Sequence, residues 1–108
     1  MITYGHEKYI EQAIESILHQ MVNFKIELIV ANDKSPDKSD EIIQNIINTH
    51  EKASLITYIN HKNNLGILGN FLFALKKCKG EFIAMCEGDD YWTDPLKLQK
   101  QVDIMRSN

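Results

Sequence analysis

The sequence predicts an α/β fold, a Rossmann-like arrangement of three layers (α/β/α) around a mostly parallel sheet. Two observations predict it. Apolar, β-branched runs at 25–31, 55–59 and 82–86 have the length of buried strands. Segments with helical spacing of apolar residues alternate with these runs. Strands that alternate with helices are joined by right-handed crossovers, which gives a parallel sheet covered on both faces.

Four helices are expected between and after the strands. Apolar residues recur at offsets of three and four from His6 to Met21, and again across 42–47 and 68–75. Asp94 followed by Pro95 matches an N-cap with proline at the first helical position, and this helix continues to Met105. Residues 1–5 are interpreted as the end of a first strand that turns into the first helix.

The composition limits the classes of protein to consider. The chain has 108 residues, of which 44% are hydrophobic and 25% charged, so we expect one globular domain over 1–108. The net charge is −3 and the basic residues do not cluster, so neither nucleic acid nor an anionic membrane is an expected partner.

Targeting signals and cysteine chemistry are also not expected. The longest apolar runs, 28–31 and 82–86, are far shorter than the roughly 20 residues of a membrane span. Near the N-terminus, His6 and the charged Glu7 and Lys8 come before any apolar stretch as long as that of a secretory signal. The expected compartment is therefore the cytoplasm. Cys78 and Cys86 are spaced too widely for a redox motif and are expected to be reduced, buried thiols.

Polar residues follow each expected strand. They include Tyr4 after the first strand, 32–35 after the second, 63–66 after the third and 87–90 after the last. Because parallel strands finish at one edge of a sheet, these loops should converge there, where ligands of such sheets bind.

The acids Glu87, Asp89 and Asp90 lie within four residues and would repel one another at close range. A divalent cation removes that conflict, and hard oxygen ligands favour Mg²⁺ or Mn²⁺. The alternative is a solvated acidic turn that serves the N-terminus of the following helix.

Asp33 could accept a hydrogen bond from the imide N–H of a uracil ring, with Tyr4 stacking on that base. The alternative is that Asp33 caps a turn and Tyr4 packs on the first helix. Asn64 and Gly66 would allow a ligand to approach the backbone, although such turns are common. The four histidines show no spacing of metal ligands and are expected at the surface or at helix ends.

Four segments in order resemble the N-terminal half of a family-2 glycosyltransferase with the GT-A fold. Residues 2–10 resemble its opening strand and turn, with Gly5 in place of the usual Asn. Residues 30–39 are similar to its Asp-Asp-x-Ser segment, with Asn32 in place of a first Asp. Residues 64–74 resemble its Asn-x-Gly segment, and 80–92 its last strand and metal motif.

The resemblance implies inverting transfer of a sugar from a nucleoside diphosphate sugar, often a UDP-sugar, with a divalent metal (Mn or Mg). The intact enzyme would act on an acceptor saccharide or a lipid-linked glycan. The implied nucleotide-binding residues are Thr3, Tyr4, Asp33, Asn64 and Asp89, and the implied metal ligands are Glu87, Asp89 and Asp90.

Two departures from the family pattern bear on activity. The first strand is cut to residues 1–3, and the acceptor-binding half with its catalytic base has no counterpart before Asn108. An inverting displacement needs a base within reach of the attacking hydroxyl. We therefore expect a truncated, donor-binding part of a glycosyltransferase and assign no catalytic residue.

Two other readings remain open. A non-catalytic α/β module could dimerise or dock through the sheet face that a missing half would cover, giving a homo-oligomer. A receiver-type signalling domain shares the size and the α/β alternation, but its acids would follow the first strand rather than the last.

Overall fold

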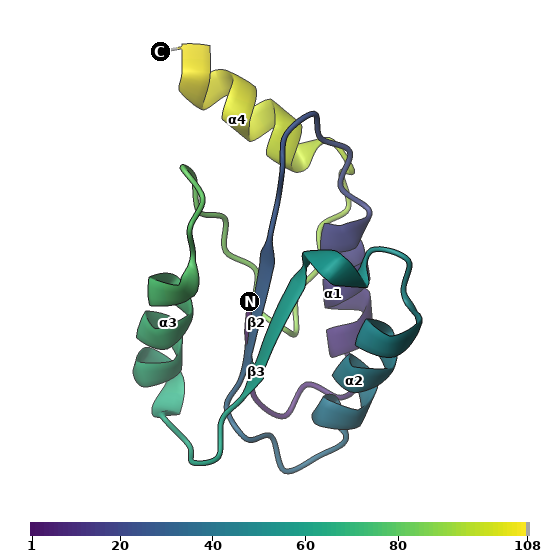
Figure 1. Ribbon diagram of the computed structural model, residues 1–108, viewed down its shortest axis with the longest axis vertical. Coiled ribbons are helices and arrows are strands. Elements are labelled where there is room, and N and C mark those ends of the chain that lie inside the picture. The colour runs from purple at the N-terminus through teal and green to yellow at the C-terminus, as the bar shows by residue number, and fades with distance from the viewer. Residues whose placement is uncertain (108) are drawn as a thin grey trace.

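The computed structural model describes residues 1–107 and contains a sheet of three parallel strands in the order β1-β2-β3. These are β1 (Ile2–Thr3), β2 (Leu28–Asn32) and β3 (Ile56–Asn60). Ile2 pairs with Ala31, and Leu28 pairs with Ile56. The central strand β2 is therefore hydrogen-bonded on both sides (Figure 1).

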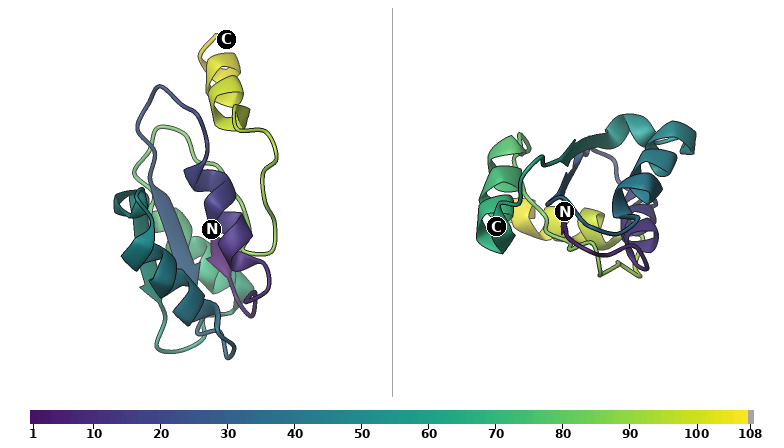
Figure 2. Two further views of the ribbon diagram at one scale, coloured as in Figure 1. Left: turned by 90° about the vertical axis from the view of Figure 1, so that its right-hand side faces the viewer. Right: turned by 90° about the horizontal axis from the view of Figure 1, so that it is seen from below.

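Helices cover both faces of this sheet, as expected. The helices are α1 (Ile10–Leu18), α2 (Ser39–Thr49), α3 (Gly66–Lys77) and α4 (Lys97–Ser107), with a 3₁₀ turn η1 (Ala53–Leu55) before β3. Helices α1 and α2 lie on one side of the sheet and α3 on the other, while α4 extends beyond the body (Figures 1 and 2). This is the three-layer α/β/α arrangement.

The alternation of side chains along β2 explains the layers. All five residues of β2 are buried. Leu28 and Val30 pack with α1 and α2 in one apolar cluster, whereas Ile29 and Ala31 pack with Ala74 of α3 in another. A strand buried on both faces reads as a continuous apolar run, which is why its position could be predicted.

Helix α3 is unusual in what it buries. Asn70 is only 2% exposed, and its amide donates to the carbonyl of Ala31 while its oxygen pairs with His61 Nε2 at 2.9 Å. In contrast, Ile67 and Leu68 are 84% and 69% exposed. The sheet-facing side of α3 is thus held by a polar anchor, and much of its apolar surface points outward.

Helix α4 is attached through its N-terminal turn. The carboxylate of Asp94 accepts the N–H of Leu96 at 2.9 Å, but Pro95 is not the first helical residue that the sequence predicted, because residues 95–96 form a turn and regular helix begins at Lys97. The buried Gln20 donates to the carbonyl of Asp94 at 2.8 Å and accepts the N–H of Leu98 at 3.0 Å. The N–H of Met21 adds a bond to the carbonyl of Pro95 at 2.7 Å.

The prediction of a strand at 82–86 is wrong, because this segment forms no ladder with a neighbouring strand. The neighbouring strand β1 has only two residues, and its carbonyl at Ile2 accepts a backbone hydrogen bond from Gly88 N–H at 3.0 Å, beyond the end of this segment. A strand needs a row of such bonds to a neighbour. The apolar pattern was suited to a strand, but β1 is too short to pair with it.

Within residues 1–107, no helix has both the length and the apolar character that crossing a membrane requires.

Candidate functional site at the carboxyl edge of the sheet

The four polar segments do converge at the carboxyl ends of the strands, as predicted. The N–H of Asp33 donates to the carbonyl of Thr3 at 3.0 Å, and the side-chain amide of Asn64 donates to the carbonyl of Asp33. Gly88 N–H bonds to Ile2 beside them. Hydrogen bonds therefore join the ends of β1 and β2 to the loop before α3 and to the acidic segment.

Asp33 is the centre of this edge. Its side chain is buried, and its two carboxylate oxygens accept the backbone N–H groups of Leu65 at 2.7 Å and Gly66 at 3.0 Å. These are the first donors of α3, which has no cap from its own side chains. Asp33 therefore does act as a capping residue, which was the alternative considered from the sequence. It caps the start of α3, more than 30 residues away, rather than a turn of its own.

The neighbouring Asn32 fixes the loop that carries Asp33. Asn32 is fully buried, its oxygen accepts the N–H of Ser35 at 3.1 Å, and its amide donates to Tyr58 Oη at 3.0 Å. The tyrosine hydroxyl in turn donates to Asp40 at 2.6 Å. Burial, together with the bond to Asp40, raises the pKa of Tyr58, so this hydroxyl stays a proton donor.

The turn after β1 explains one departure from the family pattern. Gly5 has φ +70°, and its N–H donates to Ser35 Oγ at 2.9 Å. Glycine and asparagine are the residues that adopt this left-handed region most readily, so Gly5 can stand where the family usually has Asn. Tyr4, just before it, is 53% exposed and is available to a ligand rather than packed in the core.

Thr3 occupies a different position from Tyr4. It is only 2% exposed, and its hydroxyl lies 2.8 Å from His6 Nδ1. A ligand could therefore contact the Thr3 hydroxyl only through a change at His6, whereas Tyr4 and Asn64 lie at the surface.

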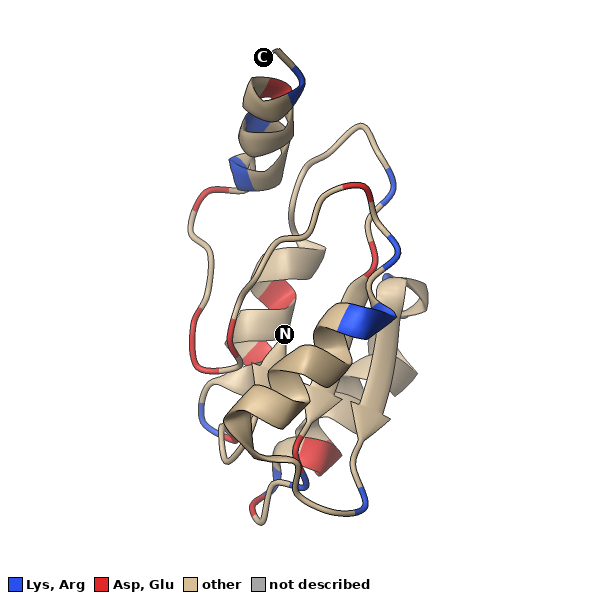
Figure 3. Ribbon diagram, turned by 90° about the vertical axis from the view of Figure 1, so that its left-hand side faces the viewer, with Lys and Arg blue, Asp and Glu red and all other residues tan. Residues whose placement is uncertain are grey.

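The acids of the last segment are exposed on a turn closed by the bond from Asp90 N–H to the carbonyl of Glu87 at 3.0 Å. One carboxylate oxygen of Asp90 accepts the N–H of Tyr91 at 2.8 Å, and Asp89 faces His6. The three carboxylates are not gathered into one group of ligands. Figure 3 shows acidic residues along the segment that leads to α4, while the basic residues are dispersed over several elements.

His6 is the residue that the sequence did not identify. It lies at a helix end, as expected, because its carbonyl accepts the N–H of Ile10 at 2.9 Å at the start of α1. The sequence did not indicate the contacts of its ring, which lies between Thr3 and Asp89, with Nε2 at 3.8 Å from Asp89 Oδ2. The spacing of histidines in the sequence could not reveal this position, because its partner Asp89 lies near the other end of the chain.

Among residues 1–107, the group of three metal-ligating side chains whose ligand atoms lie close together is Glu15, His19 and His50, remote from this edge. Their chemistry is consistent with a divalent ion. However, Lys52 N–H donates to His50 Nδ1 at 2.9 Å, which places the ring proton on Nε2, where it faces Glu15 Oε2 at 3.1 Å. His50 Nε2 could bind a metal only if the Lys52 N–H no longer donated to Nδ1, so that the ring proton could move there. In the present arrangement the bond between His50 and Glu15 links the end of α2 to α1.

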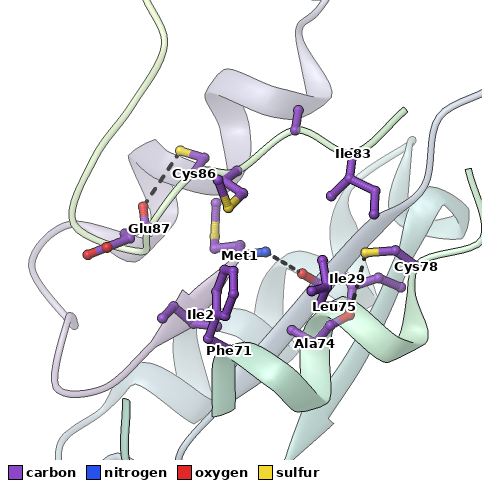
Figure 4. A pocket seen from close by; sticks show the side chains of 12 residues that line it. Met1, Ile2, Ile29, Phe71, Ala74, Leu75, Cys78, Ile83, Cys86 and Glu87 are labelled. Atoms are coloured by element: carbon purple, nitrogen blue, oxygen red, sulfur yellow. Dashed lines mark hydrogen bonds between the residues drawn. The ribbon is translucent and has the colours of Figure 1, made fainter. Parts of the chain in front are cut away.

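A separate pocket of about 90 Å³ opens between α3 and the extended segment before the acids (Figure 4). Its lining is mostly apolar and includes Met1, Phe71 and both cysteines. The cysteines are free thiols, Cys86 buried and Cys78 half-buried. Burial, followed by the charge of Asp90, raises the pKa of Cys86, so the pocket offers no thiolate from that residue.

Comparison with known proteins places the chain in a family. The sequence model described as Glycosyl transferase family 2 matches residues 1–108. An uncharacterized protein of Mycobacterium tuberculosis is 42% identical over 104 residues, which cover 96% of this chain and 30% of that protein. An Escherichia coli relative, UDP-Glc:alpha-D-GlcNAc-diphosphoundecaprenol beta-1,3-glucosyltransferase WfaP, is 34% identical over 96% of this chain and 39% of its own length.

The solved structures agree with this. The structure of TarS residues 1–349 from Staphylococcus aureus in complex with UDP superposes with a TM-score of 0.80 at 26% identity, covering 98% of this chain and 30% of that one. The chain thus has the α/β fold of GT-A glycosyltransferases. It spans 30% to 41% of the length of the first curated relatives it matches.

Proposed function

Since the chain belongs to glycosyl transferase family 2, we propose that residues 1–108 form one domain, the N-terminal part of a glycosyltransferase, and bind a nucleoside diphosphate sugar. The observation that carries the proposal is the hydrogen-bonded convergence of Asp33, Asn64 and the acidic turn at the carboxyl edge of the sheet. Ligands of open α/β sheets bind at such an edge.

Uracil is the base that we propose. Tyr4 is exposed beside Asp33 and offers an aromatic face for stacking. Each carboxylate oxygen of Asp33 has two lone pairs and uses one on the loop before α3, so it retains capacity for the imide N–H of uracil. The UDP complex of TarS, which has the same fold, supports this choice of base.

The diphosphate would meet the acidic turn, and we propose a divalent ion, Mn²⁺ or Mg²⁺, between them. Such ions are commonly held by one or two carboxylates together with phosphate oxygens, so a gathered set of three carboxylates is not required. Asp89 and Asp90 are the proposed ligands, with Glu87 as a third contributor or a charge nearby. The ion would neutralise charge on the departing diphosphate.

The full reaction is a proposal about the whole protein. The whole protein would transfer the sugar to an acceptor hydroxyl with inversion at the anomeric carbon, and it would do so in the cytoplasm. We assign no catalytic base to residues 1–108. The acceptor named for the Escherichia coli relative, a sugar on diphosphoundecaprenol, supports a lipid-linked saccharide as the acceptor class.

Calorimetry with UDP tests the donor site directly. We expect the chain to bind UDP in the presence of Mn²⁺ and to lose at least tenfold in affinity when Mn²⁺ is removed with a chelator. The variant Asp89→Ala/Asp90→Ala should bind no more tightly in Mn²⁺ than the unaltered chain does without it. Asp103→Ala, which removes an exposed carboxylate on α4, is the matched control and should bind normally.

Two results would contradict the proposal. One is binding of UDP that does not depend on the metal, and the other is equal affinity in the double variant and the control. Either result would show that the acidic turn does not bind the donor diphosphate through a metal ion.

A second candidate function is association through α3. Ile67, Leu68, Leu72 and Leu75 expose much of their apolar surface on this helix. Large exposed apolar patches promote protein contacts. This observation favours a homo-oligomer or a docking partner alongside donor binding.

A further inference from the structure

His6 connects the end of β1 with the acidic turn. Its Nδ1 lies 2.8 Å from the hydroxyl of Thr3, and its Nε2 lies 3.8 Å from Asp89 Oδ2. The side chain of His6 is 21% exposed, so the ring is largely enclosed while its Nε2 edge faces a carboxylate that is half exposed.

The contacts of the ring define the tautomer of neutral His6. If Nδ1 carried the proton, the lone pair of Nε2 would face the negative Asp89 carboxylate, which is unfavourable. When the Thr3 hydroxyl donates to Nδ1, the Nε2–H group points toward Asp89 and the interaction is attractive. Thr3 therefore orients the ring, and the ring presents a donor to Asp89.

Gly88 shows how closely this pair approaches the acidic turn. A Cβ atom at Gly88 would lie 2.7 Å from Thr3 Cβ and 2.8 Å from His6 Nδ1, closer than side chains tolerate. The backbone of the turn thus packs directly on Thr3 and His6. The bond from Gly88 N–H to Ile2 fixes the same backbone from β1.

We propose that His6 is a positioning residue of the donor site, which acts by holding the Asp89 carboxylate in the orientation that meets the donor diphosphate. This inference rests on the proposed function for its purpose, but the geometry from which it is drawn does not. Thr3 then contributes to the site through His6 rather than by touching the nucleotide.

Two conservative substitutions separate this role from a purely structural bond to Thr3. The amide of His6→Asn reaches about as far as Nδ1, so it can keep the contact with Thr3 but not the one with Asp89. The longer amide of His6→Gln reaches about as far as Nε2, so it can keep a donor toward Asp89. A structural role predicts that Asn rescues, and the positioning role predicts that Gln rescues.

Hydrogen exchange of the Gly88 and Asp90 amides, measured by NMR without nucleotide, is the first readout. We expect exchange to be about threefold to fivefold faster in His6→Ala and His6→Asn than in the unaltered chain, and nearly unchanged in His6→Gln. Affinity for UDP with Mn²⁺ should fall in the same order. His19→Ala, an exposed histidine at the end of α1, is the control and should change neither readout.

The outcomes distinguish this inference from the proposed function. Exchange that is unchanged in all variants, or that is rescued by Asn but not by Gln, would overturn the positioning role of His6. Absence of UDP binding in the unaltered chain would overturn the proposed function, and the exchange rates would still decide whether His6 holds the acidic turn.

Discussion

Asp33 combines a structural task with the binding task that we propose for it. It satisfies the first backbone donors of α3, and in our proposal it also recognises the base. A buried carboxylate held by two N–H groups is rigid, which suits recognition. Its loss should therefore affect both the stability of the fold and the affinity for nucleotide.

We expect Asp33→Asn to lower the free energy of unfolding by about 1–3 kcal/mol, because an amide has one acceptor oxygen and leaves Leu65 or Gly66 N–H without its partner. Urea denaturation followed by circular dichroism measures this change. Asp103→Asn on the exposed face of α4 should stay within about 0.5 kcal/mol of the unaltered chain. Equal stability of the two variants would show that Asp33 does not hold the loop.

The sequence allowed the meeting of Asp33 with the Asn64 loop to be predicted, because strand ends of a parallel sheet share an edge. It did not allow the position of His6 to be predicted. That position depends on the turn at Gly5 and on the path of the acidic segment past β1, neither of which is encoded in local spacing. The separation of the three carboxylates was likewise not visible in their sequence order.

At the scale of elements, the N-terminal ends of α1 and α2 are joined by reciprocal bonds. Glu7 N–H donates to Asp37 Oδ2 at 3.1 Å, and Lys38 N–H donates to Glu7 Oε2 at 3.2 Å. Asp37 also accepts the N–H and the hydroxyl of Ser39. Burial alone would raise the pKa of Asp37, but the bonds from Ser39 and Glu7 outweigh it and hold the pKa below its ordinary value.

We expect Asp37→Ala to destabilise the chain by about 1 kcal/mol at pH 7, because it removes the bonds from Ser39 and Glu7 just before α2, a loss similar in size to that of a helix cap. Because the folded-state pKa is lowered, the stabilisation is complete above the unfolded pKa near 4 and is lost as the pH falls through the folded value. Thermal melts at pH 7 and at pH 2.5 should therefore show a smaller difference between variant and unaltered chain in acid.

The control for this experiment is Glu51→Ala, which removes an exposed acid after α2. It should have little effect at either pH. A difference for Asp37→Ala that is as large in acid as at neutral pH would mean that its carboxylate charge is not the source of the stabilisation.

The helices were predicted well because each has a face that must be buried, which produces the regular spacing of apolar residues. Strands depend on a neighbour as well as on their own residues. For this reason β2 and β3, which pair over five residues, were predicted, and the segment at 82–86 was not predicted correctly.

At the scale of the whole molecule, the exposed apolar side of α3 should govern association. We expect sedimentation velocity to show a concentration-dependent dimer or larger species. Contact between two copies would bury the exposed apolar side chains of Ile67 and Leu68, and removing apolar surface from water is favourable. Ile67→Lys/Leu68→Lys should shift the chain to the monomer with little loss of stability, since both side chains are already exposed.

Met21→Lys places one lysine at an exposed apolar residue outside α3 and should leave association unchanged, whereas Ile67→Lys alone should already weaken it. A strict monomer at all concentrations, or an equal effect of both substitutions, would contradict a specific role for the α3 surface.

The way in which Gln20 holds the turn before α4 has a consequence for a chain that has been cut. A protease that cleaves once between α3 and Asp94 would cut the backbone that connects α3 to α4. The two hydrogen bonds of the Gln20 side chain, and the hydrogen bond from Met21 N–H to the carbonyl of Pro95, would still hold α4 to α1. The nicked pieces should then travel together on gel filtration and separate only in denaturant. Helix α4 is therefore a non-covalently docked part of the body, even though its far end extends into solvent.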